Sequence, residues 1–369
     1  MGRSTLHIGI DARMTHYRAG GISTTTRQLI GALEPLDTDG HAFTIFHSRK
    51  MRETLSATFA RANLWTPPHH RLERIALPVE LVRHGLDVWH TLDFIPPPFG
   101  ARRMIVSVHD LNFLHYPQFL TPESRRYYND QIAWAVGRAD HILTISESSK
   151  RDLVRLLNVA PEKITVHLLA ADASFHPLPR AETDPILHAL ELSDTYFLFV
   201  GTFEPRKNIL GLLDAYALLR NSVGAAPPLV LAGNRGWLYE ESLVRIDRLG
   251  LRDSVLLREN ISQDALPALY NRACALILPS HYEGFGLPAL EAMACGTPPI
   301  VSNRSSLPEV VGDVGLQIDP DDPAALADAM RRALSDAAWC AIQRAAGLAR
   351  AATFTWERAA RIALSVYTT

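Results

Sequence analysis

Short apolar runs alternate along the chain with longer stretches that have helical periodicity. Residues 104–108, 196–200 and 275–278 are short, mostly apolar runs of the length of a buried parallel strand. A polar or glycine-containing turn follows each run, and beyond the turn apolar residues recur three or four positions apart. Strands and helices that alternate in this way predict the α/β fold class, with doubly wound parallel sheets.

The same pattern divides the chain into two parts. Between 170 and 193 it is interrupted by prolines and aspartates, which is typical of a linker. A chain of 369 residues is also long for one domain. We therefore expect a first domain over 1–175, a second over 190–352, and an amphipathic helix within 353–369.

Composition and charge are those of an ordinary globular protein, with 47% hydrophobic and 21% charged residues. The net charge of −2 gives no electrostatic basis for binding bulk nucleic acid. Cys274, Cys295 and Cys340 are too few and too scattered for a disulfide framework or a zinc site, and they indicate buried thiols in a reducing compartment. Without a recognisable signal peptide or an apolar run near the ~20 residues of a membrane span, we expect a cytoplasmic protein.

The most informative stretch runs from Cys274 to Asp313. The strand that ends at Leu278 is followed by the loop 283–286, of sequence Glu-Gly-Phe-Gly, and by a helix that begins at about Leu287. Glu283 falls at the carboxyl end of the strand, where open α/β sheets bind ligands. Glu291 lies about one turn into the helix, so both carboxylates can face one crevice.

The glycines of this loop let the backbone approach a polar ligand near a helix N-terminus. A solvated glutamate near a helix start, favoured by the helix dipole, is the alternative interpretation. It could account for Glu291 alone, but not for the whole block.

A cationic pair follows the strand at 196–200. Gly201 allows a tight turn, and Arg206 and Lys207 stand just before the next helix. Basic residues at a helix N-terminus oppose its dipole, so an anionic ligand explains them best. Arginine supplies planar bidentate donors and lysine a compact charge, which together suit a diphosphate. A solvated basic pair in a surface loop is the alternative.

Two further candidates lie in the first half. Gly20 and Gly21 separate the first predicted strand from a helix for which Ser23 is a plausible N-cap, an arrangement that can cradle phosphate. His109 and Asp110 end the strand at 104–108. A histidine in that place can equally be a core or capping residue, and Asp110 can orient the imidazole or cap a turn.

These motifs resemble the donor site of retaining glycosyltransferases of family four. The similarity lies in EGFGLPALE at 283–291, in the CGTP and SLPEVVGD strings after it, in the Gly-x-x-x-x-Arg-Lys-Asn motif at 201–208, and in the VHDLNFL segment at 108–114. The resemblance implies a GT-B fold, in which two Rossmann-like domains face a central cleft and a C-terminal helix crosses back to the first domain.

The resemblance also implies roles for individual residues. Arg206 and Lys207 would bind the donor pyrophosphate, Glu283 and His109 the transferred sugar, and Glu291 the nucleotide ribose. The donor-binding set would further include Gly20, Gly21, Gly201, Gly284, Phe285, Gly286 and Leu287.

The implied reaction is retaining transfer of a glycosyl group from a nucleotide-diphosphate sugar to a hydroxyl of a glycan or lipid-linked acceptor. The similarity to bacterial polysaccharide mannosyltransferases favours GDP-mannose over a UDP-sugar. A sugar phosphorylase, a nucleotide-sugar epimerase and a non-catalytic nucleotide-sugar-binding protein remain alternatives. No cofactor is expected beyond the donor substrate.

Two Asp-x-Asp strings, 37–39 and 319–321, raise the possibility of a metal-dependent transferase. Both are explained by turn formation or helix capping, so we expect no catalytic metal.

Residues 67–84 combine prolines, basic residues and apolar residues. A membrane-facing patch, with peripheral association at the inner membrane face, is one interpretation. An ordinary mobile surface segment is favoured, because the apolar spacing looks irregular and Pro78 is expected to interrupt any helix.

Overall fold

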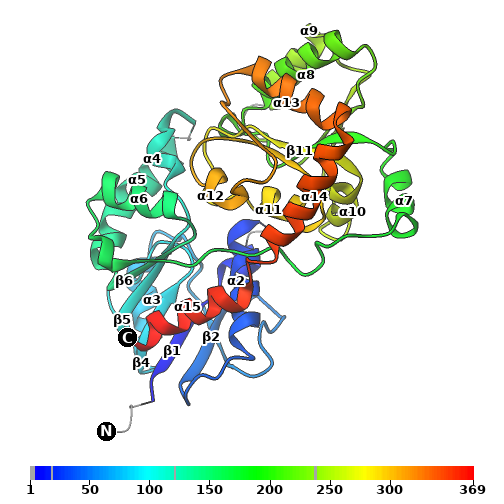
Figure 1. Ribbon diagram of the computed structural model, residues 1–369. Helices are drawn as coiled ribbons and strands as arrows, with labels where there is room; N and C mark the ends of the chain where they lie inside the picture. The colour runs from blue at the N-terminus through cyan, green and yellow to red at the C-terminus, as the bar shows by residue number, and fades with distance from the viewer. Residues whose placement is uncertain (1–4, 18–19, 120–121, 237–238) are drawn as a thin grey trace. The chain divides into compact units, whose positions relative to one another are not determined.

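The computed structural model describes residues 5–17, 20–119, 122–236 and 239–369, and the chain forms two compact units (Figure 1). The first unit comprises Met1–Leu169 together with Thr355–Thr369, and the second comprises Ala170–Phe354. Each unit is built on its own parallel sheet. Within the described residues, no helix is long and apolar enough to cross a membrane.

The first unit contains a seven-stranded parallel sheet in the order β3-β2-β1-β4-β5-β6-β7. Its strands are β1 (His7–Asp11), β2 (Ala42–Ser48), β3 (Ala60–Leu64), β4 (Leu86–Thr91), β5 (Ala101–Val108), β6 (His141–Thr144) and β7 (Ile164–Val166). Its helices are α1 (Met14–Tyr17), α2 (Gly21–Leu33), α3 (Glu73–Val82), α4 (Asn112–His115), η1 (Pro117–Phe119), α5 (Pro122–Arg138), α6 (Glu147–Leu157), η2 (Pro161–Lys163) and α15 (Trp356–Thr368).

The second unit contains a six-stranded parallel sheet in the order β10-β9-β8-β11-β12-β13. Its strands are β8 (Tyr196–Val200), β9 (Leu229–Ala232), β10 (Val255–Arg258), β11 (Ala273–Leu278), β12 (Pro299–Ser302) and β13 (Leu316–Ile318). Its helices are α7 (Arg180–Ala189), η3 (Pro205–Lys207), α8 (Ile209–Val223), α9 (Tyr239–Arg248), α10 (Leu266–Arg272), α11 (Leu287–Ala294), α12 (Leu307–Val311), α13 (Pro323–Ser335) and α14 (Ala337–Ala351).

Both sheets reverse their strand order at one point, next to the first strand of the unit. In the first unit β1 pairs with β2 on one side and β4 on the other, and in the second unit β8 pairs with β9 and β11. Chains leave the two strands at such a point toward opposite faces, so a crevice opens at the carboxyl ends of the strands. The predicted fold class, two doubly wound Rossmann-like domains, is confirmed.

Helix α15 completes the core of the first unit, although it is the last element of the chain. Ala360, Ala363 and Tyr367 pack into the cluster formed by β1 and α2, and Figure 1 shows α15, in red, beside α2. The buried Tyr367 hydroxyl lies 2.7 Å from Nδ1 of His90 on β4. The Arg103 guanidinium donates to the carbonyls of Val366 and Tyr367, which satisfies acceptors that a helix end leaves without intrahelical partners.

Three local expectations were wrong. The proposed linker contains helix α7, in which Thr183 and Leu187 are buried despite Pro185. Ser23 is inside α2 and not its cap, because the helix begins at Gly21 with Gly20 as N-cap. Residues 67–84 are not an irregular surface segment: helix α3 runs through Pro78, and its Leu77 and Leu81 are fully buried.

Proline removes one backbone donor from a helix interior, at a cost of about 3 kcal/mol. In α3 the burial of Leu77 and Leu81 against Phe46, Trp89 and Met104 offsets that loss. The periodicity of the buried positions was therefore a better guide to this segment than the proline.

Candidate functional site

The strands β8 and β11 are neighbours in the sheet, so the loops that follow them meet at its carboxyl edge. The first loop, 201–208, carries the cationic pair, and the second, 279–286, carries Glu283. The backbone N–H of His281 donates to the carbonyl of Arg206 (2.7 Å), and the Arg206 guanidinium donates to the carbonyl of Tyr282 (3.1 Å). The two loops are thereby fixed to each other at the point where the strand order reverses.

Glu283 forms a buried ionic cluster with both predicted cations. Its Oε1 lies 2.6 Å from Nζ of Lys207, and its Oε2 lies 3.0 Å from Nη1 of Arg206. The Ser280 hydroxyl donates to the same carboxylate at 2.7 Å. Arg206 also pairs with Glu204 at 2.8 Å. The side chains of Lys207 and Glu283 are only 8% and 7% exposed, so water screens their attraction weakly.

This cluster fixes the charge of Glu283. Burial alone would raise the pKa of the carboxyl group, but Lys207 and Arg206 outweigh it and hold the pKa at about 2. Burial lowers the pKa of Lys207, and the attraction of Glu283 opposes that change. We take the pair as ionic at neutral pH, because two cations and a hydroxyl donor all favour the charged carboxylate. The site therefore holds a permanent negative charge beside two donors suited to phosphate oxygens.

Two serines that the sequence did not single out hold the Glu283 backbone. The Ser305 hydroxyl accepts from the N–H of Glu283 at 2.9 Å, and the Ser306 hydroxyl lies 2.8 Å from the carbonyls of both Glu283 and Phe285. Ser306 begins the SLPEVVGD string and Ser305 directly precedes it, and the resemblance of that string to the family motif was the only available signal.

In the loop before α11 the backbone can come close to a ligand. Gly286, the N-cap, has φ +106°, and a Cβ there would meet Leu307 at 2.7 Å, so only glycine fits. The Phe285 side chain is 3% exposed and packs edge-on against Phe354, so only the backbone of this predicted donor-binding residue can reach a ligand. At this helix start Pro288 has no N–H and the N–H groups of Ala289 and Leu290 donate to the Gly286 carbonyl, so the Leu287 N–H is the donor that can serve an anion or hydroxyl.

Gly201 turns the chain directly beside the cationic pair. It has φ +152°, and a Cβ there would lie 3.5 Å from Cε of Lys207. Asn208 then caps α8 by accepting from the N–H of Gly211 (3.3 Å) and donates its amide to the carbonyl of Pro320 (2.7 Å). These contacts hold Arg206 and Lys207 at the start of α8, as the sequence predicted.

Glu291 lies on helix α11, which follows the loop that carries Glu283, and the surroundings of the two carboxyl groups differ. Its carboxyl accepts from the buried Tyr270 hydroxyl on α10 at 2.7 Å. Burial, with a smaller contribution from Asp172, raises the pKa of Glu291 to about 7, although the Tyr270 hydrogen bond works against the rise. No cation pairs with it among the described ion pairs. The two glutamates therefore differ sharply in acidity, one permanently charged and one near its midpoint at neutral pH.

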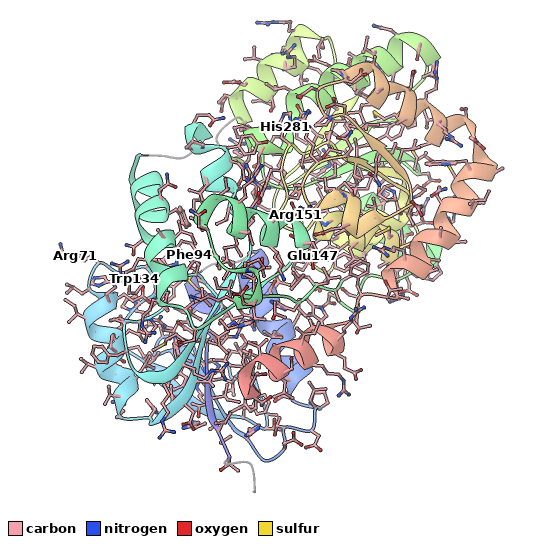
Figure 2. All side chains as sticks on the ribbon, turned by 60° about the vertical axis from the view of Figure 1, so that its left-hand side comes forward. Arg71, Phe94, Trp134, Glu147, Arg151 and His281 are labelled. Atoms are coloured by element: carbon pink, nitrogen blue, oxygen red, sulfur yellow. The ribbon has the colours of Figure 1, made fainter. Side chains whose placement is uncertain are left out.

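The two Asp-x-Asp strings have local structural explanations. Arg304 donates to Asp319 at 2.9 Å and to Asp321 at 2.6 Å, and Asp322 caps α13. His281, labelled in Figure 2, lies 3.6 Å from Asp321. Asp37 accepts from the N–H of Asp39 in a tight turn. Among the described residues, no group of three or more His, Cys, Asp or Glu side chains is arranged to hold a metal ion.

In the first unit, His109 lies at the carboxyl end of β5, as predicted. Its Nε2 is 2.9 Å from the carbonyl oxygen of Leu92, which can only accept, so the ring carries its proton on Nε2 and Nδ1 is the acceptor of the neutral imidazole. Asp110 accepts from the N–H of Asn112 and so caps a turn instead of orienting the imidazole. Ser146 caps α6.

The predicted glycine loop lies partly outside the described residues, at 18–19. Gly20 has φ +137° as the N-cap of α2, and a Cβ on Gly20 or Gly21 would meet nothing within 4 Å. Neither glycine is required by local crowding, although the φ of Gly20 suits glycine best.

A polar network that sequence reasoning missed lies where β1 and β4 end. The buried Arg13 guanidinium pairs with Asp11 (2.7 Å) and Glu73 (2.6 Å) and donates to the carbonyl of Thr66. Beside it, His69 contacts Asp93, and these side chains line a small cavity. Burial opposes the ionised form of Asp93, yet His69 lowers the pKa of its carboxyl group. The Asp-Ala-Arg string after the first strand was its only sequence signal.

Comparison with known proteins shows which family the chain resembles. Residues 19–173 match the model of Glycosyltransferase Family 4, and residues 182–350 match that of Glycosyl transferases group 1. O-antigen chain mannosyltransferase B of Escherichia coli is 38% identical over 272 residues, which cover 73% of this chain and 71% of that protein.

Two further comparisons define the extent of the likeness. The serotype-specific mannosyltransferase WbdA of Escherichia coli is 34% identical over 283 residues, 74% of this chain but only 34% of that longer protein. The solved structure of sucrose-phosphate synthase from Thermosynechococcus elongatus superposes with a TM-score of 0.77 at 23% identity, covering 98% of both chains, and thus shares the GT-B fold. The chain belongs to the family 4 glycosyltransferases, the retaining enzymes of the GT-B fold.

Proposed function

We propose that this glycosyltransferase moves mannose from GDP-mannose to a hydroxyl of a glycan or lipid-linked acceptor during polysaccharide assembly, at the cytoplasmic face of the membrane. The buried cluster of Glu283, Arg206 and Lys207 at the strand-order reversal carries the proposal, because it joins a diphosphate clamp to a charged sugar-side carboxylate. The similarity to an O-antigen mannosyltransferase supports the choice of sugar.

In the proposed reaction Arg206 and Lys207 donate to the diphosphate and stabilise the charge that grows on it as the sugar departs. Preorganised charge of this kind is usually the largest contribution to catalysis in such sites. The backbone N–H of Leu287, which begins α11 beside Gly284 and Gly286, adds a donor on the same side. No bound cofactor takes part.

The two glutamates take separate roles. Glu283 fixes the transferred sugar and its negative charge favours the positive charge that develops at the anomeric carbon. Glu291 accepts hydrogen bonds from the nucleotide ribose, in the place where the Tyr270 hydroxyl already donates to it. For His109 we propose a contact between Nδ1, the acceptor atom of its ring, and a hydroxyl of the donor sugar.

A UDP-sugar is the alternative donor. Backbone groups can bind a nucleobase, and in that case the side chains do not identify which base is bound. Thermal unfolding with GDP-mannose, GDP-glucose, UDP-glucose and UDP-galactose distinguishes them. A donor at about 100 times its Kd stabilises by about 2.7 kcal/mol. We expect the largest shift with GDP-mannose, and a larger shift with either UDP-sugar would refute the choice of donor.

A non-catalytic nucleotide-sugar binder is a second alternative. It would show the same thermal shift, but would neither transfer mannose to an acceptor nor slowly hydrolyse GDP-mannose. Release of GDP by the purified protein, lost in Glu283→Gln, is the expected result.

A further inference from the structure

Helix α3 is apolar on two opposite sides. Its inner side buries Leu77 and Leu81 in the core of the first unit. Its outer side exposes Ile75, Val79 and Val82 by 69%, 67% and 60%, and Leu72, just before the helix, by 50%. These four positions are spaced by three, four and three residues, which places them on one stripe of an α-helix. A helix with apolar residues on both sides normally lies inside a protein, yet here one side is uncovered.

Two further exposed aromatic residues lie next to α3. Trp65, 65% exposed, is tied to α3 because its backbone N–H donates to Glu80. Phe99, 51% exposed, precedes Gly100, whose backbone lies against Leu81. We call Leu72, Ile75, Val79, Val82, Trp65 and Phe99 the α3 surface. The other large apolar residues exposed in the described parts of the chain are scattered over other elements: Tyr17, Leu156, Leu218, Val244 and Ile342.

The exposed charges around the α3 surface are positive. Arg71 and Arg83 are exposed at the two ends of α3. Figure 2 shows Arg71 at the margin of the first unit. The Arg49 guanidinium stacks over the Trp65 ring at 4.1 Å. The acidic residues of α3 turn inward: Glu73 is 6% exposed and pairs with Arg13, and the Glu80 carboxylate accepts from the N–H groups of Trp65 and Thr66.

The helix is also held firmly in place. Glu73 anchors its first turn to Arg13, beside the end of β1, and the Arg74 guanidinium stacks on the ring of Trp134 at 3.9 Å and contacts Gln131, both on α5. An apolar stripe thus stands in a fixed orientation, and a partner need not order it on binding.

We propose that the α3 surface docks this enzyme on an anionic lipid bilayer, with the apolar stripe in the headgroup region and Arg71 and Arg83 on lipid phosphates. Apolar helix faces with aromatic residues and flanking arginines are the composition that binds at a membrane interface. Long arginine side chains keep their charge in the polar layer while their stems lie along apolar groups. A second copy of the chain fits less well, because a symmetric dimer through this surface would place like charges together.

Docking through α3 would bring the carboxyl edge of the first sheet toward the lipid. Glu73 joins the helix to Arg13 at that edge, where His69 and Asp93 line the small cavity. This would favour an acceptor carried on a lipid. The docking proposal itself does not depend on the donor sugar or on the roles assigned to the two glutamates.

The test is co-sedimentation of the full-length protein with vesicles of equal parts phosphatidylglycerol and phosphatidylcholine, and with vesicles of phosphatidylcholine alone. Binding is expected to the first and to be much weaker to the second. Ile75→Gln/Val79→Gln should reduce partition by about tenfold or more, because both apolar side chains lose their burial. Arg71→Gln/Arg83→Gln should reduce it by about 25-fold, at about fivefold per charge, with less effect at high salt.

The matched control is Val244→Gln/Ile342→Gln, in which two similarly exposed residues of the second unit change in the same way. Its partition should equal that of the wild type, and all variants should transfer sugar to a water-soluble acceptor at the wild-type rate. Failure of the wild type to bind anionic vesicles would overturn the proposal, as would equal losses in the α3 and control variants. A wild-type dimer that Ile75→Gln/Val79→Gln separates in sedimentation would assign the surface to a second copy instead.

Discussion

Nζ of Lys207 lies 2.6 Å from Oε1 of Glu283, although the two residues are 76 positions apart in the chain. Each follows the end of a strand, β8 or β11, and these strands are neighbours. In the proposed function, the Glu283 carboxylate and a donor diphosphate are alternative partners for the same two cations. The proposed roles would therefore link nucleotide binding to the charge on Glu283.

The first prediction concerns Glu283→Gln. The kcat should fall by about 10²–10³, because one preorganised charge at the sugar is lost. The nucleoside diphosphate should bind more tightly, since the anion that competes for Arg206 and Lys207 is gone. Initial rates and calorimetry test the two effects, and Glu357→Gln, which removes an exposed ion pair with Arg361 on α15, is the control. Weaker diphosphate binding with an unchanged kcat would contradict the assignment.

The second prediction concerns stability. Lys207→Ala leaves Glu283 buried with one cation fewer, and should lower the free energy of unfolding by about 3 kcal/mol. In Lys207→Ala/Glu283→Gln the uncompensated charge is absent, so the loss should be smaller than the sum of the two single losses by about 0.5–3 kcal/mol. Denaturant unfolding of the four proteins measures this coupling. Strict additivity would show that the ion pair contributes nothing to the folded state.

The third prediction concerns metal ions. Asp319 and Asp321 pair with Arg304, and the charge on the leaving diphosphate is assigned to Arg206 and Lys207. Transfer should therefore continue at an unchanged rate in excess EDTA. Loss of activity that manganese restores would show that a metal ion carries part of that role.

The strand and loop pattern predicted where several candidate residues lie, because they stand just after apolar runs. Arg206 and Glu283 follow the neighbouring strands β8 and β11, whose carboxyl ends meet at one edge of the second sheet, and His109 follows β5 in the first sheet. The pattern could not show which side chains meet. The ion pair of Lys207 with Glu283 depends on the strand order, which sequence periodicity does not contain.

The failures have a common physical origin. Pro78 in α3 and Pro185 in α7 both lie inside helices, because burial of leucines on the inner faces compensates for the one hydrogen bond that each proline removes. In α3 the apolar outer stripe also obscured the helical periodicity of the apolar positions. Apolar residues on two sides of a helix look irregularly spaced in the sequence. The Arg13 network was missed because its members lie far apart in the chain, at 11–13, 69–73 and 93.

The acidity of Glu291 gives the last prediction its basis. The ordinary pKa of a glutamate, 4.5, is raised in the folded protein to about 7 by burial. The folded state therefore keeps a proton that the unfolded state releases between these values. The contribution of the group to stability is present below pH 4.5 and is lost as the pH rises toward 7.

The fourth prediction follows for Glu291→Gln, which keeps the shape of the side chain and cannot ionise. At pH 8 this variant should be more stable than the wild type by up to about 3 kcal/mol, at 1.36 kcal/mol per pKa unit. At pH 4.5 the difference should vanish.

The affinity for nucleotide should be lower in Glu291→Gln than in the wild type at pH 8, because only the ionised carboxylate accepts fully from the ribose hydroxyls. Wild-type affinity for GDP should rise between pH 6 and 8 more steeply than that of Glu291→Gln, while Glu283→Gln keeps the wild-type slope. Thermal unfolding and calorimetry across this range measure both effects. An identical slope in the wild type and Glu291→Gln would remove Glu291 from the nucleotide site.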